Sequence, residues 1–186
     1  MPALTPPVVA GLPLEQPTLD AGPFTLRPWR GTDASDLLAV YADPAVQRWH
    51  CQTLTPVEAA HYAATWAGLW SAGTRAGWAV VRSTALVGRI TLGRLDLEGG
   101  QAEVTYWTVP AARGSGVAPL AVTALTAWSF QLGLQRLELQ HSTQNRSSCR
   151  VAEKVGFALE GTKRRAGLHL DGWHDMHLHA RLSPGR

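Results

Sequence analysis

The feature that most constrains the fold of this chain is a glycine-rich turn between a strand pattern and a helix pattern. Residues 102–109 alternate as a strand does, and Pro110 ends that strand. Residues 117–128 carry apolar side chains every three or four positions, and residues 136–140 alternate again. A strand, a helix and a second strand in this order predict two parallel strands joined by a crossover. We expect the inward face of the helix to consist of Val117, Leu120, Ala121, Ala124, Leu125 and Trp128.

The segment before the turn predicts an antiparallel meander. Residues 78–82, 85–97 and 102–109 are rich in β-branched side chains and are separated by short polar breaks, which is typical of three antiparallel strands. Upstream, residues 24–29 predict another strand, and a short helix capped at Thr32 or Asp33 follows it.

Two further helices are marked by their caps. Thr55, with Pro56 and Glu58 behind it, forms a capping box at the start of a helix that should run to residue 71. Asn145 is placed to cap a helix that Gly156 ends. Residues 157–160 and 173–182 predict the closing strands.

The length of 186 residues fits one domain. Half of the twelve prolines fall within residues 1–23, so we expect an extended proline-rich arm there, with structure beginning near Phe24 and a single domain over residues 24–186. No apolar run is long enough to span a membrane, and no signal-peptide pattern opens the chain, which predicts a cytoplasmic protein without membrane contact. Cys51 and Cys149 are too far apart to indicate a disulfide framework.

The net charge of +3 is spread without a dense basic stripe, so we expect no nucleic acid partner. His174, His177 and His179 resemble a metal-ligand run, but only the last two share a face of a strand, and no fourth ligand is apparent. The sequence therefore predicts no metal.

The glycine-rich turn has two interpretations. A helix N-terminus offers unpaired backbone N–H groups to an anion, and glycine lets the anion approach the main chain, which makes this turn a candidate phosphate cradle. Turn geometry alone could also require the glycines. A Walker loop is excluded because no lysine lies nearer than Lys154, and a dinucleotide fingerprint would meet Pro119 at its last small position. The candidate cradle consists of Arg113, Gly114, Ser115, Gly116, Val117 and Ala118.

The pattern Arg113-x-x-Gly116-x-Ala118 resembles the acetyl-coenzyme A (acetyl-CoA) signature of the GNAT acetyltransferase superfamily. The stretches FTLRPW, AEVTYWTVP and NRSSCRVAEKVGF resemble further segments of that family, and residues 160–182 resemble the branch containing ribosomal-protein N-terminal acetyltransferases. The resemblance covers roughly residues 24–182. It implies a mixed α/β fold: a mostly antiparallel sheet, flanked by helices, whose parallel strand pair splays around the cofactor.

The resemblance also implies where acetyl-CoA binds. The diphosphate would lie on the amides of the glycine-rich turn, with Asn145 nearby, and the pantetheine would lie along the strand that ends at Val109. The backbone amides of Thr108 and Val109 would bind it there and polarise the thioester carbonyl.

Two side chains are candidates for catalysis. Glu103 matches a glutamate of this branch and would act as the base that deprotonates an amine, directly or through water; alternatively it solvates the strand or pairs with an arginine. Ser148 would protonate or position the departing thiol; alternatively its hydroxyl only bonds the helix backbone. Many relatives use a tyrosine as the acid, but no tyrosine follows the strand at residues 136–140.

The sequence therefore predicts an acetyl-CoA-dependent N-acetyltransferase that transfers directly to a primary amine, such as a protein N-terminus, with a homodimer as a candidate assembly. A small-amine acetyltransferase and a non-catalytic acyl-CoA-binding module remain as alternatives. Trp66 and Trp70 share one side of a helix and either pack in the core or line the acceptor pocket.

Overall fold

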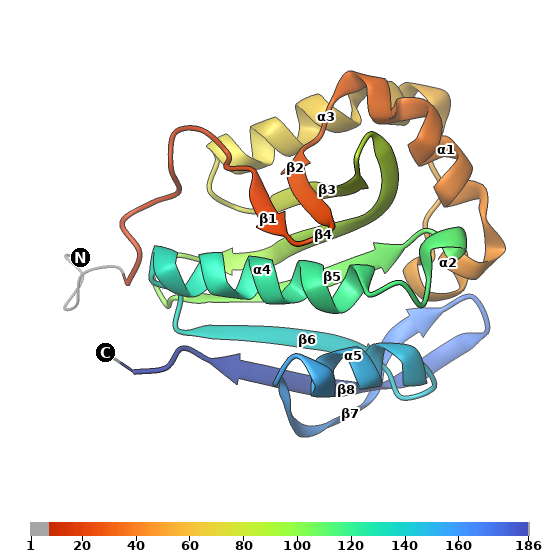
Figure 1. The fold of residues 1–186 in the computed structure, drawn as a ribbon. Coiled ribbons are helices and arrows are strands. Elements are labelled where there is room, and N and C mark those ends of the chain that lie inside the picture. The colour runs from red at the N-terminus through yellow and green to blue at the C-terminus, as the bar shows by residue number, and fades with distance from the viewer. Residues whose placement is uncertain (1–7, 186) are drawn as a thin grey trace.

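A computed structural model describes residues 8–185, which form a mixed sheet with helices on both faces (Figure 1). The strand order is β1-β2-β3-β4-β5-β6-β8-β7. The strands are β1 Leu19–Ala21, β2 Phe24–Pro28, β3 Ala76–Arg82, β4 Ala85–Asp96, β5 Gln101–Thr108, β6 Arg136–Ser142, β7 Ala158–His169 and β8 Gly172–Leu182. The helices are α1 Ala34–Ala42, α2 Pro44–His50, α3 Pro56–Ser71, α4 Val117–Leu132 and α5 Arg146–Lys154.

The sheet topology confirms the predicted fold class. Strands β3, β4 and β5 form the expected antiparallel meander, and β5 pairs with β6 in parallel across α4. This parallel pairing covers only the start of the two strands and ends where Glu103 lies opposite Glu138. Beyond that pair β5 and β6 diverge, which leaves one edge of β5 without a strand partner.

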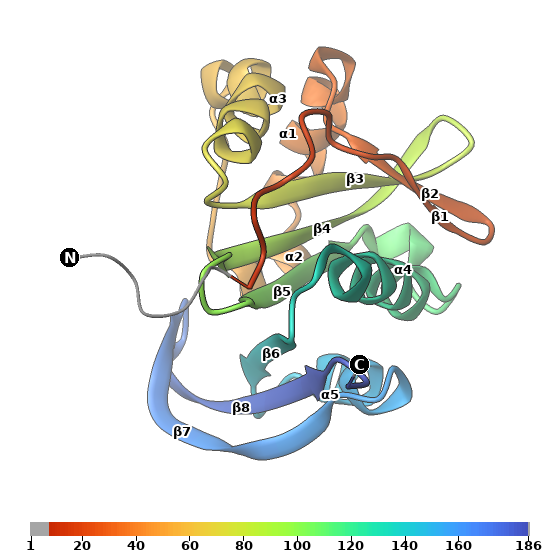
Figure 2. The same cartoon turned by 90° about the vertical axis from the view of Figure 1, so that its left-hand side faces the viewer.

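Two apolar clusters fill the two sides of the sheet. Helices α4 and α5 lie on one side, and α1 and α3 lie on the other (Figures 1 and 2). Trp70 and Trp78 pack edge to face and are buried, so Trp70 belongs to the core rather than to a pocket wall. Trp66 packs beside the same sheet over Gly77. No helix within residues 8–185 is long and apolar enough to cross a membrane.

The caps predicted from the sequence are confirmed for two helices. The Thr55 side chain accepts from the Glu58 N–H, and the Glu58 carboxylate accepts from the Thr55 N–H at 2.8 Å. The Asn145 side chain accepts from the Ser148 N–H at 3.1 Å and so begins α5. On α4 one expected core position is wrong: Leu120 is 38% exposed, and Val122 is buried instead.

The prediction that structure begins near Phe24 is also wrong. Leu19–Ala21 already forms strand β1 along β2. Upstream of it, Val9 is buried, and its N–H donates to the Leu97 carbonyl at 3.0 Å. The indole of Trp78 donates to the Pro17 carbonyl at 2.8 Å. Prolines lack a backbone N–H, so this segment forms few hydrogen bonds within itself. These contacts pair its backbone groups with the rest of the chain, so residues 8–23 pack against the domain. Residues 1–7 of the predicted arm lie outside the described residues.

Candidate active site

The glycine-rich turn leads into helix α4, whose N-terminus has no side-chain cap among the described residues. Gly114 and Gly116 adopt left-handed φ angles of 79° and 86°, which glycine takes at low cost, and α4 begins directly after them. The Ser115 hydroxyl turns back and donates to the Ala112 carbonyl at 2.7 Å. Among the described residues no side chain caps α4, so its first N–H groups remain available to an anion.

The backbone N–H groups at the free edge of β5 differ from the predicted pair, Thr108 and Val109. The Val109 N–H donates to the Val87 carbonyl on β4 at 2.9 Å, so the expectation that this amide binds the thioester is wrong. In an antiparallel pair, the backbone N–H and C=O groups of successive residues point alternately toward the partner strand and away from it. Because Thr108 is opposite Gly88 and Tyr106 is opposite Ile90, their N–H groups point away from β4, toward the edge that β6 leaves.

A cavity of about 510 Å³ joins this edge to the turn. It brings together most of the predicted cofactor residues with cationic side chains from α5 and with the short helix α2. The sequence analysis missed α2, because a seven-residue helix shows little periodicity; its one local signal is Asp43, which caps it ahead of Pro44. The cavity is lined in part by His50, Thr108, Arg113, Gly114, Gly116, Val117, Ala118, Asn145, Arg150 and Lys154. Ser115 and Val109 are not among its lining residues.

A second cavity of about 200 Å³ shares His50 and Asn145 with the first, and Ser148 lines it. Close to it the Tyr106 hydroxyl and the Ser148 hydroxyl form a hydrogen bond of 2.7 Å. Burial raises the pKa of Tyr106 to about 12, so the phenol stays protonated at neutral pH. Tyr106 was not expected at the site, since it precedes α4 in sequence and only the splay of β5 from β6 lets it reach α5.

Glu103 lies apart from Ser148. Side chains alternate along β5, so Glu103 and Tyr106 point to opposite faces of the strand. Glu103 is half-buried, its carboxylate is 3.3 Å from the exposed Arg94 guanidinium, and it is not among the residues that line the two cavities. Burial raises the pKa of this carboxyl, with the nearby Glu138 adding to the shift and Arg94 opposing it. The structure therefore does not bring the two predicted catalytic residues together.

His50 should make the stability of the protein depend on pH. Burial, helped by the Arg89 guanidinium, lowers its pKa to about 3. An unfolded histidine binds a proton below about pH 6.5, so the unfolded state takes up protons first and stability falls as the pH falls below 6.5. We expect a loss of about 1 to 2 kcal/mol between pH 6.5 and 5.

Urea unfolding at several pH values measures this effect. His50→Gln should flatten the dependence, whereas His61→Gln on the exposed face of α3 should keep it. An unchanged slope in His50→Gln would contradict the assignment.

The chain is similar to known proteins of one family. Residues 24–158 match the model of the acetyltransferase (GNAT) domain. The "Putative ribosomal N-acetyltransferase YdaF" of Bacillus subtilis (strain 168) is 35% identical over 91 residues, which are 48% of this chain and 49% of that protein. The ribosomal-protein-serine acetyltransferase of Escherichia coli (strain K12) is 31% identical over 104 residues, which are 55% of this chain and 58% of that protein. The matched regions thus span only about half the length of these relatives.

One solved structure is that of RimL, a ribosomal L7/L12 alpha-N-protein acetyltransferase in complex with coenzyme A (CoA). It has a TM-score of 0.83 at 17% identity, covering 89% of this chain and 98% of that one, and so shows the fold alone. The family match covers well over half of the chain. This chain belongs to the GNAT acetyltransferase family, a family of acyl-transferring enzymes.

Proposed function

We propose that this protein is an acetyl-CoA-dependent N-acetyltransferase that transfers the acetyl group directly to a primary amine, with a protein N-terminus as the acceptor. The observation that supports it best is the uncapped start of α4, which opens into the same cavity as the free edge of β5. A diphosphate and an amide-bearing chain need these two kinds of backbone group side by side.

Charge and backbone geometry support the following assignment for the parts of acetyl-CoA. The N–H groups between Gly114 and Ala118 would hold the diphosphate, and Arg150 and Lys154 would add positive charge from α5. The pantetheine would complete the open edge of β5 as an added strand does. There the N–H groups of Thr108 and Tyr106, rather than that of Val109, would donate to the ligand.

The transfer itself needs a neutral amine and a protonated leaving group. The amine nitrogen attacks the thioester carbonyl carbon, the C–S bond breaks, and the amine loses a proton while the thiolate gains one. Glu103, whose pKa is raised by burial, would accept the amine proton through water, since it lines neither cavity. The hydrogen-bonded hydroxyls of Tyr106 and Ser148 would supply the proton to sulfur. Family membership implies no metal in this reaction.

The names of the relatives favour a protein acceptor. The two curated relatives described above are named as ribosomal acetyltransferases, and RimL is described as an alpha-N-protein acetyltransferase. An α-amino group has a pKa near 8 and so needs less help from a base than a lysine with a pKa near 10.4. The homodimer and the cytoplasmic location stay predictions.

A product assay tests the proposal. The protein is incubated with acetyl-CoA and peptides of ribosomal-protein N-terminal sequence, and mass spectrometry locates the acetyl group. Control peptides carry a blocked N-terminus and one internal lysine, and a parallel panel contains small amines. We expect acetylation of the free α-amino group with release of one thiol for each product. Acetylation of small amines alone would reject the protein acceptor, and acetyl-CoA binding without thiol release would reject catalysis.

A further inference from the structure

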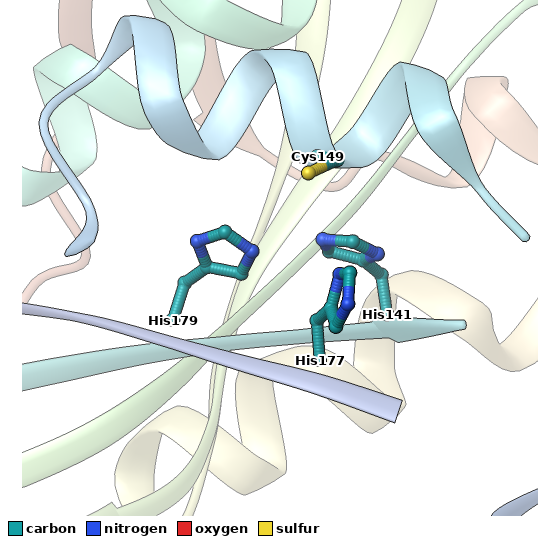
Figure 3. Close-up of side chains that lie close together, drawn as sticks. All are labelled: His141, Cys149, His177 and His179. Carbon is teal, nitrogen blue, oxygen red and sulfur yellow. The ribbon is translucent and has the colours of Figure 1, made fainter. Parts of the chain in front are cut away.

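Four side chains that can ligate a metal meet on the α5 side of the sheet. His141 on β6 lies directly opposite His177 on β8, and His179 is two residues further along β8 on the same face. Cys149 reaches down from α5 toward the three imidazole rings (Figure 3). One ligand atom from each residue lies within 4.8 Å of those from the other three. The sequence alone pairs only His177 with His179, because β6 and α5 reach this point through tertiary packing.

Three buried ring nitrogens of these histidines have no hydrogen-bond partner within the described part of the chain. They are Nε2 of His141, Nδ1 of His177 and Nε2 of His179. His179 is fully buried and His141 is 5% exposed. A buried polar atom without a partner has lost its hydrogen bonds to water without replacement, so three of them together need a further explanation.

The opposite nitrogens of two rings are already engaged. His141 Nδ1 donates to the Ser142 carbonyl at 2.9 Å, and His179 Nδ1 lies 3.3 Å from the Phe157 carbonyl. A carbonyl can only accept, so each ring carries its proton on Nδ1 and directs the lone pair of Nε2 into the cluster. Metal-bound histidines are oriented in this way by backbone carbonyls.

We propose that His141, His177, His179 and Cys149 bind one divalent ion of the zinc class at a structural site. Three imidazoles and one thiolate are donors that suit tetrahedral zinc. The usual zinc–nitrogen and zinc–sulfur lengths place such ligand atoms roughly 3.3 to 3.7 Å apart. From separations of up to 4.8 Å, side-chain rotations would have to bring the atoms closer by about 1 Å. Binding replaces the Cys149 thiol proton by the metal–sulfur bond and releases that proton to solvent.

The ion would join three elements that hold the candidate active site. It would tie α5 to β6 and β8; Asn145 caps α5, and Ser148 lies in its first turn. The thiol now donates weakly to the Glu153 carboxylate at 3.5 Å, an exposed contact that a metal–sulfur bond would replace. None of the four ligands has a role in the proposed acetyl transfer, although His141 also lines the second cavity.

Cobalt and zinc binding test the proposal. The full chain is purified, stripped with a chelator and titrated with Co²⁺, whose visible spectrum reports tetrahedral geometry and whose near-ultraviolet band reports a thiolate ligand. We expect one equivalent of Co²⁺ with both features, displacement of cobalt by one equivalent of Zn²⁺, and a higher melting temperature with zinc. No thiolate band, or no tetrahedral spectrum, would overturn the assignment.

Variants identify the ligands. Cys149→Ser should lose the thiolate band. Cys149→Ser and His177→Gln should each weaken zinc binding about 100-fold or more. Changes to residues around the ligands reach about 100-fold at most, so the loss of a ligand should cost at least that much. Cys51→Ser, which removes the other cysteine, and His61→Gln are matched controls and should bind zinc as the unaltered protein does. Equal zinc affinity in all four variants would overturn the proposal. The cobalt spectrum of the unaltered protein decides the question even if a ligand variant fails to fold.

Discussion

Gly116→Val is expected to weaken acetyl-CoA binding about 100-fold, which corresponds to about 2.7 kcal/mol. Gly116 has a φ of 86°, a conformation that a β-branched residue adopts only under strain. A Cβ at this position would lie 3.7 Å from Leu120 Cδ1, an ordinary contact. The loss should therefore come from the backbone, which would rotate the N–H groups of the turn away from the diphosphate.

Calorimetric titration with CoA measures this loss directly. Gly161→Val is the matched control, because Gly161 lies in β7 without a left-handed φ, and a Cβ added there would meet no atom within 4 Å. The control should bind CoA as the unaltered protein does. Wild-type affinity in folded Gly116→Val would mean that the diphosphate binds elsewhere.

Glu103→Gln is expected to lower kcat for a peptide acceptor about 100-fold at neutral pH and to leave the affinity for CoA unchanged. A general base contributes about 10² to 10⁴ in rate, and an amine with a pKa near 8 requires the lower end of that range. With Glu103 present, activity should fall as the pH falls through the raised pKa of this carboxyl, because the protonated form cannot accept a proton.

The pH profile separates this role from a structural one. In Glu103→Gln, kcat should no longer fall at acidic pH through protonation of Glu103, and it should depend on pH only through protonation of the amine. Glu138→Gln is the control, since Glu138 is the residue opposite Glu103 on β6 and its carboxylate accepts from Arg136 at 2.9 Å. Equal kcat values and pH profiles for Glu103→Gln and the unaltered protein would show that Glu103 only pairs with Arg94.

Much of the fold was predictable because its signals are local. The capping box at Thr55, the meander of β3 to β5 and the crossover through α4 each depend on residues close in sequence. The glycine-rich turn was predictable for the same reason, because the left-handed conformation of Gly116 and the helix start behind it are encoded within a few residues.

Other features of the site were not predictable, because they depend on register and on contacts between distant segments. The direction of the Val109 N–H follows from the pairing of β4 with β5, which the pattern of side chains does not reveal. Tyr106 meets Ser148 only because β5 and β6 diverge after Glu103. Helix α2 is too short for periodicity to indicate it, yet it supplies one wall of the cavity.

The sequence by itself determined the order of most strands and helices, though not β1 or α2, and the glycine-rich turn, since backbone preference and apolar periodicity act over a few residues. Only the tertiary structure decided which groups meet at one point. It turned the edge of β5 toward an open cavity, separated Glu103 from Ser148, and assembled His141, Cys149, His177 and His179 from three elements. The physical reason is that sheet register and helix packing decide which side chains from different elements come together, and no single segment encodes either of them.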